Sequence, residues 1–226
     1  MLVAETCGIA LPEAAAALER VQPFMGRMQP IRLPNGATIL RDEHNGSPDT
    51  LEAALRVLTE ARARRKVLVL GSISDSREKS RVRFRRLGQQ AAQVADLAIF
   101  VGEHGHHAVK AAIATGLAKD QVREFVTPAQ TAVYLKTELR SGDLVLIKGR
   151  ATEHLSRIVF AQFGQIGCWT TFCRKRISCD TCDQLRPEFD LRALSPLGAD
   201  LQTAPTSTAK RPTVKNAGAE TYAQRD

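Results

Sequence analysis

Several common signatures are missing from this sequence of 226 residues. It has no apolar run near the ~18 residues that span a bilayer, and no basic residue precedes its first apolar residues as in a secretory signal. It also contains neither G-x-x-x-x-G-K-[ST] nor G-x-G-x-x-G, the usual motifs that hold nucleotide phosphates. These absences predict a soluble, cytoplasmic protein. If it handles ATP, another component must cradle the phosphates.

The composition suits a folded domain with a basic surface. Apolar residues make up 43% of the chain, which is enough for one domain with a core, and the net charge is +8. The positive charge gathers at 62–66, 77–86 and 174–176. Solvated helix faces and a soluble tail explain such runs better than a nucleic-acid surface, although the second reading stays open.

The first third of the chain contains clear start and turn signals. Pro12 and the following alanines predict a helix over 11–20. Asn35-Gly36, between strand-like flanks, indicates a hairpin with a two-residue turn. Ser47 is a suitable N-cap for a helix that begins at Pro48.

The central part alternates between apolar strands and helices. Strands are expected at 66–70, 97–101, 124–126 and 144–147, and helices at 78–94, 106–115, 128–139 and 152–162. This alternation predicts an α/β fold: a Rossmann-like, mostly parallel sheet with helices on both faces, preceded by the hairpin. Ligands of such sheets bind beyond the carboxyl ends of the strands.

The stretch 42–50, DEHNGSPDT, concentrates polar residues directly after the second hairpin strand. Turns and helix caps favour these residue types, so a purely structural role is about as plausible as a functional one. In the functional reading, Asp42, His44 and Asn45 leave the strand end together and face a ligand.

The histidines His104, His106 and His107 follow another expected strand. Their spacing does not suit a three-ligand metal site unless the loop curls, so solvated loop histidines are the favoured reading. Their position beyond a strand's carboxyl end leaves a substrate contact open.

A cysteine cluster follows the last expected helix, with the spacing C-x4-C-x5-C-x2-C. Its members are Cys168, Cys173, Cys179 and Cys182. Four thiolates predict a tetrahedral Zn²⁺ site, which would be structural because no open position is left for catalysis. Trp169 and Phe172 are expected to pack against it. Free thiols or disulfides are the alternatives, and disulfides fit poorly with a cytoplasmic chain.

A basic run, RKR at 174–176, lies inside this cluster. A basic zinc knuckle with an aromatic side chain can bind single-stranded nucleic acid through stacking and phosphate contacts. A nucleic-acid-binding module is therefore the rival function. It explains neither DEHNGSPDT nor Gly26-Arg27 and ranks second.

Four segments, in order and spacing, resemble the C-terminal domain of Mur ligases, most closely the type that adds D-alanyl-D-alanine to a cell-wall precursor. They are Gly26-Arg27, DEHNGSPDT, VLVLG at 67–71 and GDLVLIKG at 142–149. The chain departs from the family pattern at His44, where tyrosine is usual, at Ser47, where asparagine is usual, and at Thr50, where serine is usual.

The resemblance implies an ATP-dependent amide ligase, in which ATP phosphorylates a carboxylate and an amine attacks the acyl phosphate. It implies that Arg27, Asp42 and Asn45 face the nucleotide, with Mg²⁺ held by the central domain. His44, Lys148 and Arg150 would lie on the side of the amino-acid or dipeptide substrate.

The resemblance also implies a division of the chain. Residues 1–28 would be a remnant of the central domain and linker, 29–165 the C-terminal ligase domain, 166–190 the four-cysteine zinc segment and 191–226 a disordered tail. The P-loop half would be missing, so the chain alone should be inactive. A separate ATP-binding chain, or truncation of a longer ligase, would account for the missing half. Neither a nucleic-acid partner nor a membrane partner is expected.

Overall fold

The computed structural model describes residues 2–21, 23–73, 78–175 and 177–187. The tail predicted over 191–226 lies outside these residues. None of the helices within these ranges has the length and apolar character needed to cross a bilayer.

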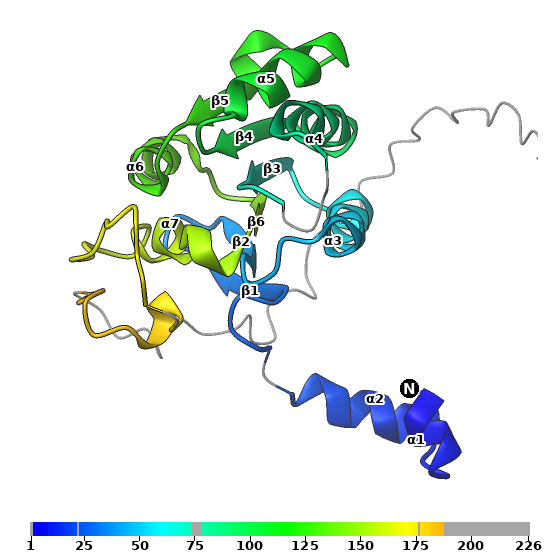
Figure 1. The fold of residues 1–226 in the computed structure, drawn as a ribbon. Coiled ribbons are helices and arrows are strands. Elements are labelled where there is room, and N and C mark those ends of the chain that lie inside the picture. The colour runs from blue at the N-terminus through cyan, green and yellow to red at the C-terminus, as the bar shows by residue number, and fades with distance from the viewer. Residues whose placement is uncertain (1, 22, 74–77, 176, 188–226) are drawn as a thin grey trace, which may run out of the picture.

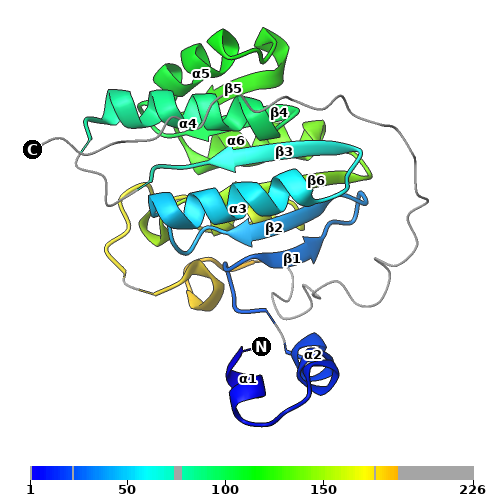
Figure 2. The ribbon, with the colours of Figure 1, turned by 90° about the vertical axis from the view of Figure 1, so that its right-hand side faces the viewer.

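A six-stranded sheet forms the centre of the fold (Figures 1 and 2), in the order β1-β2-β6-β3-β4-β5. The first two strands pair antiparallel, and every other neighbouring pair is parallel. The mostly parallel sheet preceded by a hairpin is therefore confirmed. The strands are β1 Gln29–Arg32, β2 Thr38–Asp42, β3 Arg65–Leu70, β4 Leu97–Val101, β5 Val122–Phe125 and β6 Asp143–Lys148.

The hairpin turn is longer than predicted. Leu33 N donates to Ala37 O (2.8 Å), which leaves three loop residues rather than two. Gly36 has φ +85°, the left-handed position that follows a turn in three-residue loops. Asn35 explains the wider loop, because its side chain accepts from Ala37 N and donates to Leu139 O.

Helices cover both faces of the sheet. The helices are α1 Leu2–Thr6, α2 Leu11–Glu19, α3 Pro48–Glu60, α4 Ser80–Val94, α5 Gly105–Ala114, α6 Pro128–Glu138 and α7 Ser156–Phe160. Figure 1 shows α3, α4 and α5 on one face, α6 and α7 on the other, and α1 and α2 apart from the sheet. The predicted cap of α3 is present, since Ser47 Oγ accepts from Thr50 N (3.4 Å).

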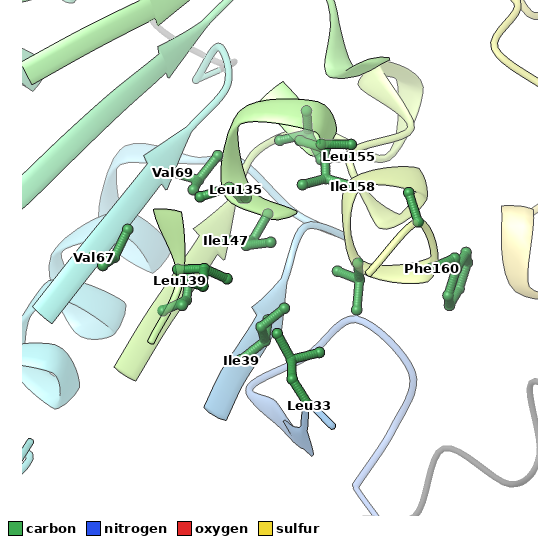
Figure 3. Close-up of a cluster of buried hydrophobic side chains, with 14 of the residues drawn as sticks. Leu33, Ile39, Val67, Val69, Leu135, Leu139, Ile147, Leu155, Ile158 and Phe160 are labelled. Atoms are coloured by element: carbon green, nitrogen blue, oxygen red, sulfur yellow. The ribbon is translucent and has the colours of Figure 1, made fainter. Parts of the chain in front are cut away.

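Two apolar cores lie on opposite faces of the sheet. Val67 and Val69 point into the core under α6 and α7, whereas Leu68 and Leu70 point into the core under α3, α4 and α5. This separation follows from the alternation of side chains along a strand. Figure 3 shows the first core, where Leu135, Ile158 and other side chains meet the sheet.

The helix predicted over 152–162 is interrupted. A 3-10 turn, Ala151–Glu153, precedes α7, and His154 between them adopts the left-handed conformation with φ +54°. The left-handed residue ends the 3-10 turn, and His154 is buried at this position.

Candidate functional site

The carboxyl ends of β2 and β6 lie side by side and form the first part of the site. Asp42 pairs in register with Lys148. The ammonium of Lys148 donates to Asp42 Oδ2 (2.6 Å) and to the carbonyl oxygen of Asn45 (2.8 Å). Lys148 is only 1% exposed, so this buried cation holds the strand end and the following turn together.

The linker before β1 also contacts the Asp42 carboxylate. Met28 N donates to Asp42 Oδ1 (3.1 Å), and Met28 adopts φ +46°. The neighbouring Arg27 is exposed, and its guanidinium makes no hydrogen bond or ion pair within the part of the chain that the structure describes. The exposed Arg27 therefore directly precedes Met28, whose backbone contacts Asp42.

A second, buried network crosses from β2 to the C-terminal segment. Arg41 donates through both terminal nitrogens to Asp180 (2.7 and 3.0 Å) and reaches Glu43 Oε1 at 2.6 Å. Its guanidinium also lies 4.8 Å from the ring centre of Phe160. One buried cation thus meets two carboxylates.

Burial and pairing with Arg41 shift the pKa values of Glu43 and Asp180 in opposite directions. Burial raises the pKa of Glu43 above its usual range, although Arg41 opposes the shift. Burial also favours a higher pKa for Asp180, but the hydrogen bonds and charge of Arg41 outweigh it and lower the pKa of Asp180. Asp180 is therefore the carboxylate that Arg41 keeps ionised most strongly.

A cavity of about 430 Å³ opens beside this network. It lies between the linker, the end of β2, the start of α7 and the C-terminal segment. Glu43 lines it, and Glu43 Oε2 is buried without a hydrogen-bond partner. His44 also lines it, with its ring edge-on to Phe24 at 6.0 Å between centroids. The other lining residues are Met25, Gly26, Arg41, Ala151, Thr152, His154, Ser156, Cys173, Arg174, Lys175, Ile177, Ser178, Cys179 and Asp180.

Sequence reasoning missed Glu153, which ties two loops at this edge of the sheet. Its carboxylate accepts from Ser72 N (2.7 Å) and Arg150 N (2.9 Å). Burial raises the pKa of Glu153 despite these hydrogen bonds. A Cβ at Gly71 would lie 2.5 Å from Glu153 Oε2, so the glycine is required for the approach. The signal available in the sequence was a glycine directly after one strand, Gly71, and a glutamate shortly after another, Glu153.

The predicted site residues are only partly brought together. Asp42, Asn45 and Lys148 form one contact set, and Arg27 adjoins it through Met28. His44 lies on the cavity wall. Arg150 is exposed, and its chain runs beside Gly46, where a Cβ would lie 3.0 Å from Arg150 Cγ. Their roles toward a nucleotide or an amine stay predictions.

The predicted four-cysteine zinc site is not formed. Within residues 2–21, 23–73, 78–175 and 177–187, no three His, Cys, Asp or Glu side chains gather as metal ligands. Cys179 turns inward to the core and its sulfur lies 3.3 Å from His154 Nδ1. The sulfurs of Cys168 and Cys182 contact Thr170 and Lys175 instead.

The prediction that Phe172 packs against the cysteine cluster is also wrong. Phe172 is 90% exposed rather than packed on a metal cluster. The basic zinc knuckle required by the nucleic-acid hypothesis is therefore absent from the described segment.

The three histidines lie at the start of α5 rather than in an open loop. The rings of His106 and His107 are 3.9 Å apart between centroids, and His104 packs edge-on against Phe84. No metal-binding group forms there within the described ranges.

Comparison with known proteins identifies the domain. The family model described as Mur ligase, glutamate ligase domain, matches residues 26–151, more than half of the chain. That range contains the Lys148 contact set and both ends of the linker contact.

Two curated relatives illustrate the match. The UDP-N-acetylmuramoyl-tripeptide–D-alanyl-D-alanine ligase of Mycobacterium leprae is 30% identical over 159 residues, which cover 63% of this chain and 31% of that protein. The UDP-N-acetylmuramoyl-L-alanyl-D-glutamate–2,6-diaminopimelate ligase of Rickettsia felis is 29% identical over 142 residues, covering 61% and 26%. The chain spans about a third of the length of these relatives or less.

Solved structures share the fold. MurF from Acinetobacter baumannii superimposes with a TM-score of 0.57 at 23% identity, covering 69% of this chain and 34% of that one. MurF ligase from Thermotoga maritima, solved in complex with ADP, gives 0.57 at 20% identity, covering 71% and 35%.

Proposed function

Because the chain belongs to the Mur ligase family, we propose that it acts as the C-terminal, nucleotide-closing and amino-acid-binding part of an ATP-dependent amide ligase of cell-wall precursor synthesis. The observation that carries this proposal is the Lys148 contact set. It joins Asp42 to the Asn45 turn at the carboxyl edge of the sheet, next to the exposed Arg27.

In this proposal Arg27 and Asp42 approach a nucleotide from the hinge side. A guanidinium matches phosphate oxygens, and the exposed Arg27 is available for that contact. Asp42 accepts hydrogen bonds from Lys148 and Met28, but each carboxylate oxygen can accept more than one. Asp42 therefore retains the capacity to accept from a ribose hydroxyl, and Asn45 lies next to it.

Catalysis would then depend on cations and donors that stabilise charge on the transferred phosphoryl group. Mg²⁺, when bound, would neutralise phosphate oxygens, and none of the described residues gathers as a site for it. The amine substrate, an amino acid or a dipeptide, would enter from the side of His44, Lys148 and Arg150. Of these three residues, His44 lines the cavity of about 430 Å³.

The phosphate cradle has to come from elsewhere. This sequence contains no G-x-x-x-x-G-K-[ST] motif. We expect a separate ATP-binding chain, or the remainder of a longer polypeptide, to supply it in the cytoplasm. The chain alone should then be inactive.

The test is a coupled assay of ADP release. The chain is mixed with UDP-N-acetylmuramoyl-tripeptide and D-alanyl-D-alanine, with and without a P-loop central domain. Ligation only in the presence of that domain is expected. Arg27→Ala should lower the rate at least tenfold, since a cation near the transferred charge is lost. Arg62→Ala, an exposed residue before β3 at the opposite edge, is the matched control.

Two results would overturn the proposal. One is no ligation with any amine when the central domain is present and binds ATP. The other is a rate that falls equally in Arg27→Ala and Arg62→Ala.

A further inference from the structure

A basic groove of about 450 Å³ runs between α4 and α5, and it shares no residue with the ligase site. Arg81, Arg85 and Gln89 line it from α4 at intervals of four residues, which places them on one face of that helix. The other wall is the facing side of α5: His107, Lys110, Ala111, Ala114 and Thr115. Figures 1 and 2 both show the two helices side by side.

Tight helix packing keeps the two walls together. Gly88 is buried in α4, and a Cβ at this position would collide with the carbonyl oxygen of Ala108 in α5. The missing side chain lets the backbones approach closely. The two helices that carry the cationic lining residues are therefore held close together.

The charge in this groove is not compensated by the described residues. No acidic side chain is among those that line it. Arg81, Arg85 and Lys110 form no ion pair in the part of the chain that the structure describes, whereas the adjacent Arg86 pairs with Glu78 at 2.7 Å. Like charges that line one groove repel one another, and a bound anion reduces this repulsion.

His107 also lines the groove. Partial desolvation and the neighbouring His106 lower the pKa of His107 most, and Arg81, His104 and Lys110 lower it further. The shift agrees with the geometry, in which two arginines and a lysine share the groove with the imidazole.

We propose that this groove binds a small molecule carrying several phosphate charges, such as a di- or triphosphate. Guanidinium groups fit phosphate oxygens in pairs, and Lys110 adds a point charge. The cavity has the size of small-molecule sites. None of its lining residues is Phe, Tyr or Trp, so the groove lacks the stacking platform of proteins that bind single-stranded nucleic acid.

The proposal joins two features of the sequence that the ligase function does not use. One is the arginine-rich part of α4, from which Arg81 and Arg85 line the groove, and the other is the histidine group after β4, from which His107 lines it. They are separate in the sequence and meet only because α4 packs on α5. The proposal does not depend on the ligase function.

The experiment is a titration of the whole chain with inorganic tripolyphosphate, followed by ¹⁵N–¹H NMR at constant ionic strength. Saturable shifts are expected at amides of α4 and α5. Binding should raise the pKa of the His107 imidazole, because the anion cancels the neighbouring positive charge. The double variant Arg81→Glu/Arg85→Glu should weaken binding at least tenfold.

The matched control is Arg56→Glu/Arg62→Glu, which changes the charge equally at exposed positions around α3. Its affinity should stay within twofold of the parent chain. Equal weakening by both double variants would show a non-specific charge effect and would overturn the proposal. So would non-saturable shifts, or tighter binding of a single-stranded oligonucleotide than of tripolyphosphate at equal phosphate concentration. Far-UV circular dichroism checks that each variant is folded.

Discussion

At the scale of single residues, Lys148 organises the candidate site. Its ammonium is buried, and its partners come from the end of β2 and the turn that follows. A lysine in a buried position is tolerated only when its charge is paired and hydrogen-bonded. Both conditions are met by Asp42 and the Asn45 carbonyl.

Replacing Lys148 with methionine should lower the free energy of unfolding by roughly 3 kcal/mol or more. The substitution keeps the apolar stem but leaves the Asp42 carboxylate and the Asn45 carbonyl without their cation, and breaking a buried pair typically costs about 3–5 kcal/mol. Urea denaturation measures the change. Lys136→Met, at an exposed position on α6, is the control and should stay within about 0.5 kcal/mol. Equal, small losses in both variants would contradict the structural role of Lys148.

Some of these residues could be recognised from the sequence alone. Asp42 and Asn45 belong to a local polar stretch after an expected strand. The partner of Arg41 could not be found in this way, because Asp180 lies 139 positions later. A long-range contact between one arginine and one aspartate leaves no periodic or local signal.

At the scale of elements, the C-terminal segment 177–187 contacts the sheet domain through an ion pair and through side chains that enter the core. Asp180 pairs with Arg41 on β2, while Cys179 and Leu185 enter the core beside α7. The cysteine spacing predicted that a metal would order this segment. Within the described residues no metal-ligand group forms, and Cys179 and Leu185 are buried in the core.

Asp180→Asn should release this segment. Loss of the charge weakens a buried ion pair, at a cost of about 3 kcal/mol, which corresponds to roughly a hundredfold loss of amide protection. Hydrogen–deuterium exchange of residues 179–185 measures it. Asp183→Asn is the control, because Asp183 is 85% exposed and pairs with Lys175. Unchanged protection in Asp180→Asn would refute the role of the pair.

The difference in amide protection between the parent chain and Asp180→Asn should depend on pH in a definite direction. Asp180 has a pKa below its ordinary value in the folded protein. Its contribution to stability is therefore fully present above the ordinary aspartate pKa and is lost as the pH falls through the lower, folded value. The gap in protection between the parent chain and Asp180→Asn should be constant near neutral pH and close only in acid.

At the scale of the whole molecule, the sheet domain and the N-terminal helices are separate. Figure 1 shows α1 and α2 away from the sheet, and α2 buries a single residue, Ala14. Leu11 and Leu18 remain about half exposed, at 48% and 56%. These helices therefore contribute little to the core of the domain.

Deleting residues 2–20 should change the free energy of unfolding of the sheet domain by less than about 1 kcal/mol, because little apolar area is lost. Chemical denaturation of the shortened chain tests this. As a positive control, Ile31→Ala removes a side chain that is 1% exposed in the hairpin and should cost about 2–5 kcal/mol. A loss above about 2 kcal/mol on deletion would mean that α1 and α2 dock on the domain.

The sequence by itself determined most of the strands and helices and the family, but not the break at His154 before α7. These features depend on local patterns that can be recognised in neighbouring residues: apolar alternation, N-caps such as Ser47 and the order of four short motifs. The tertiary structure alone decided which distant groups meet: Arg41 with Asp180, Glu153 with Ser72, and α4 with α5 around the basic groove. It also places Cys179 in the core, and no group of three metal-ligating side chains gathers within the described residues. These long-range contacts depend on how the helices and strands pack together, and no single stretch of the sequence indicates that packing.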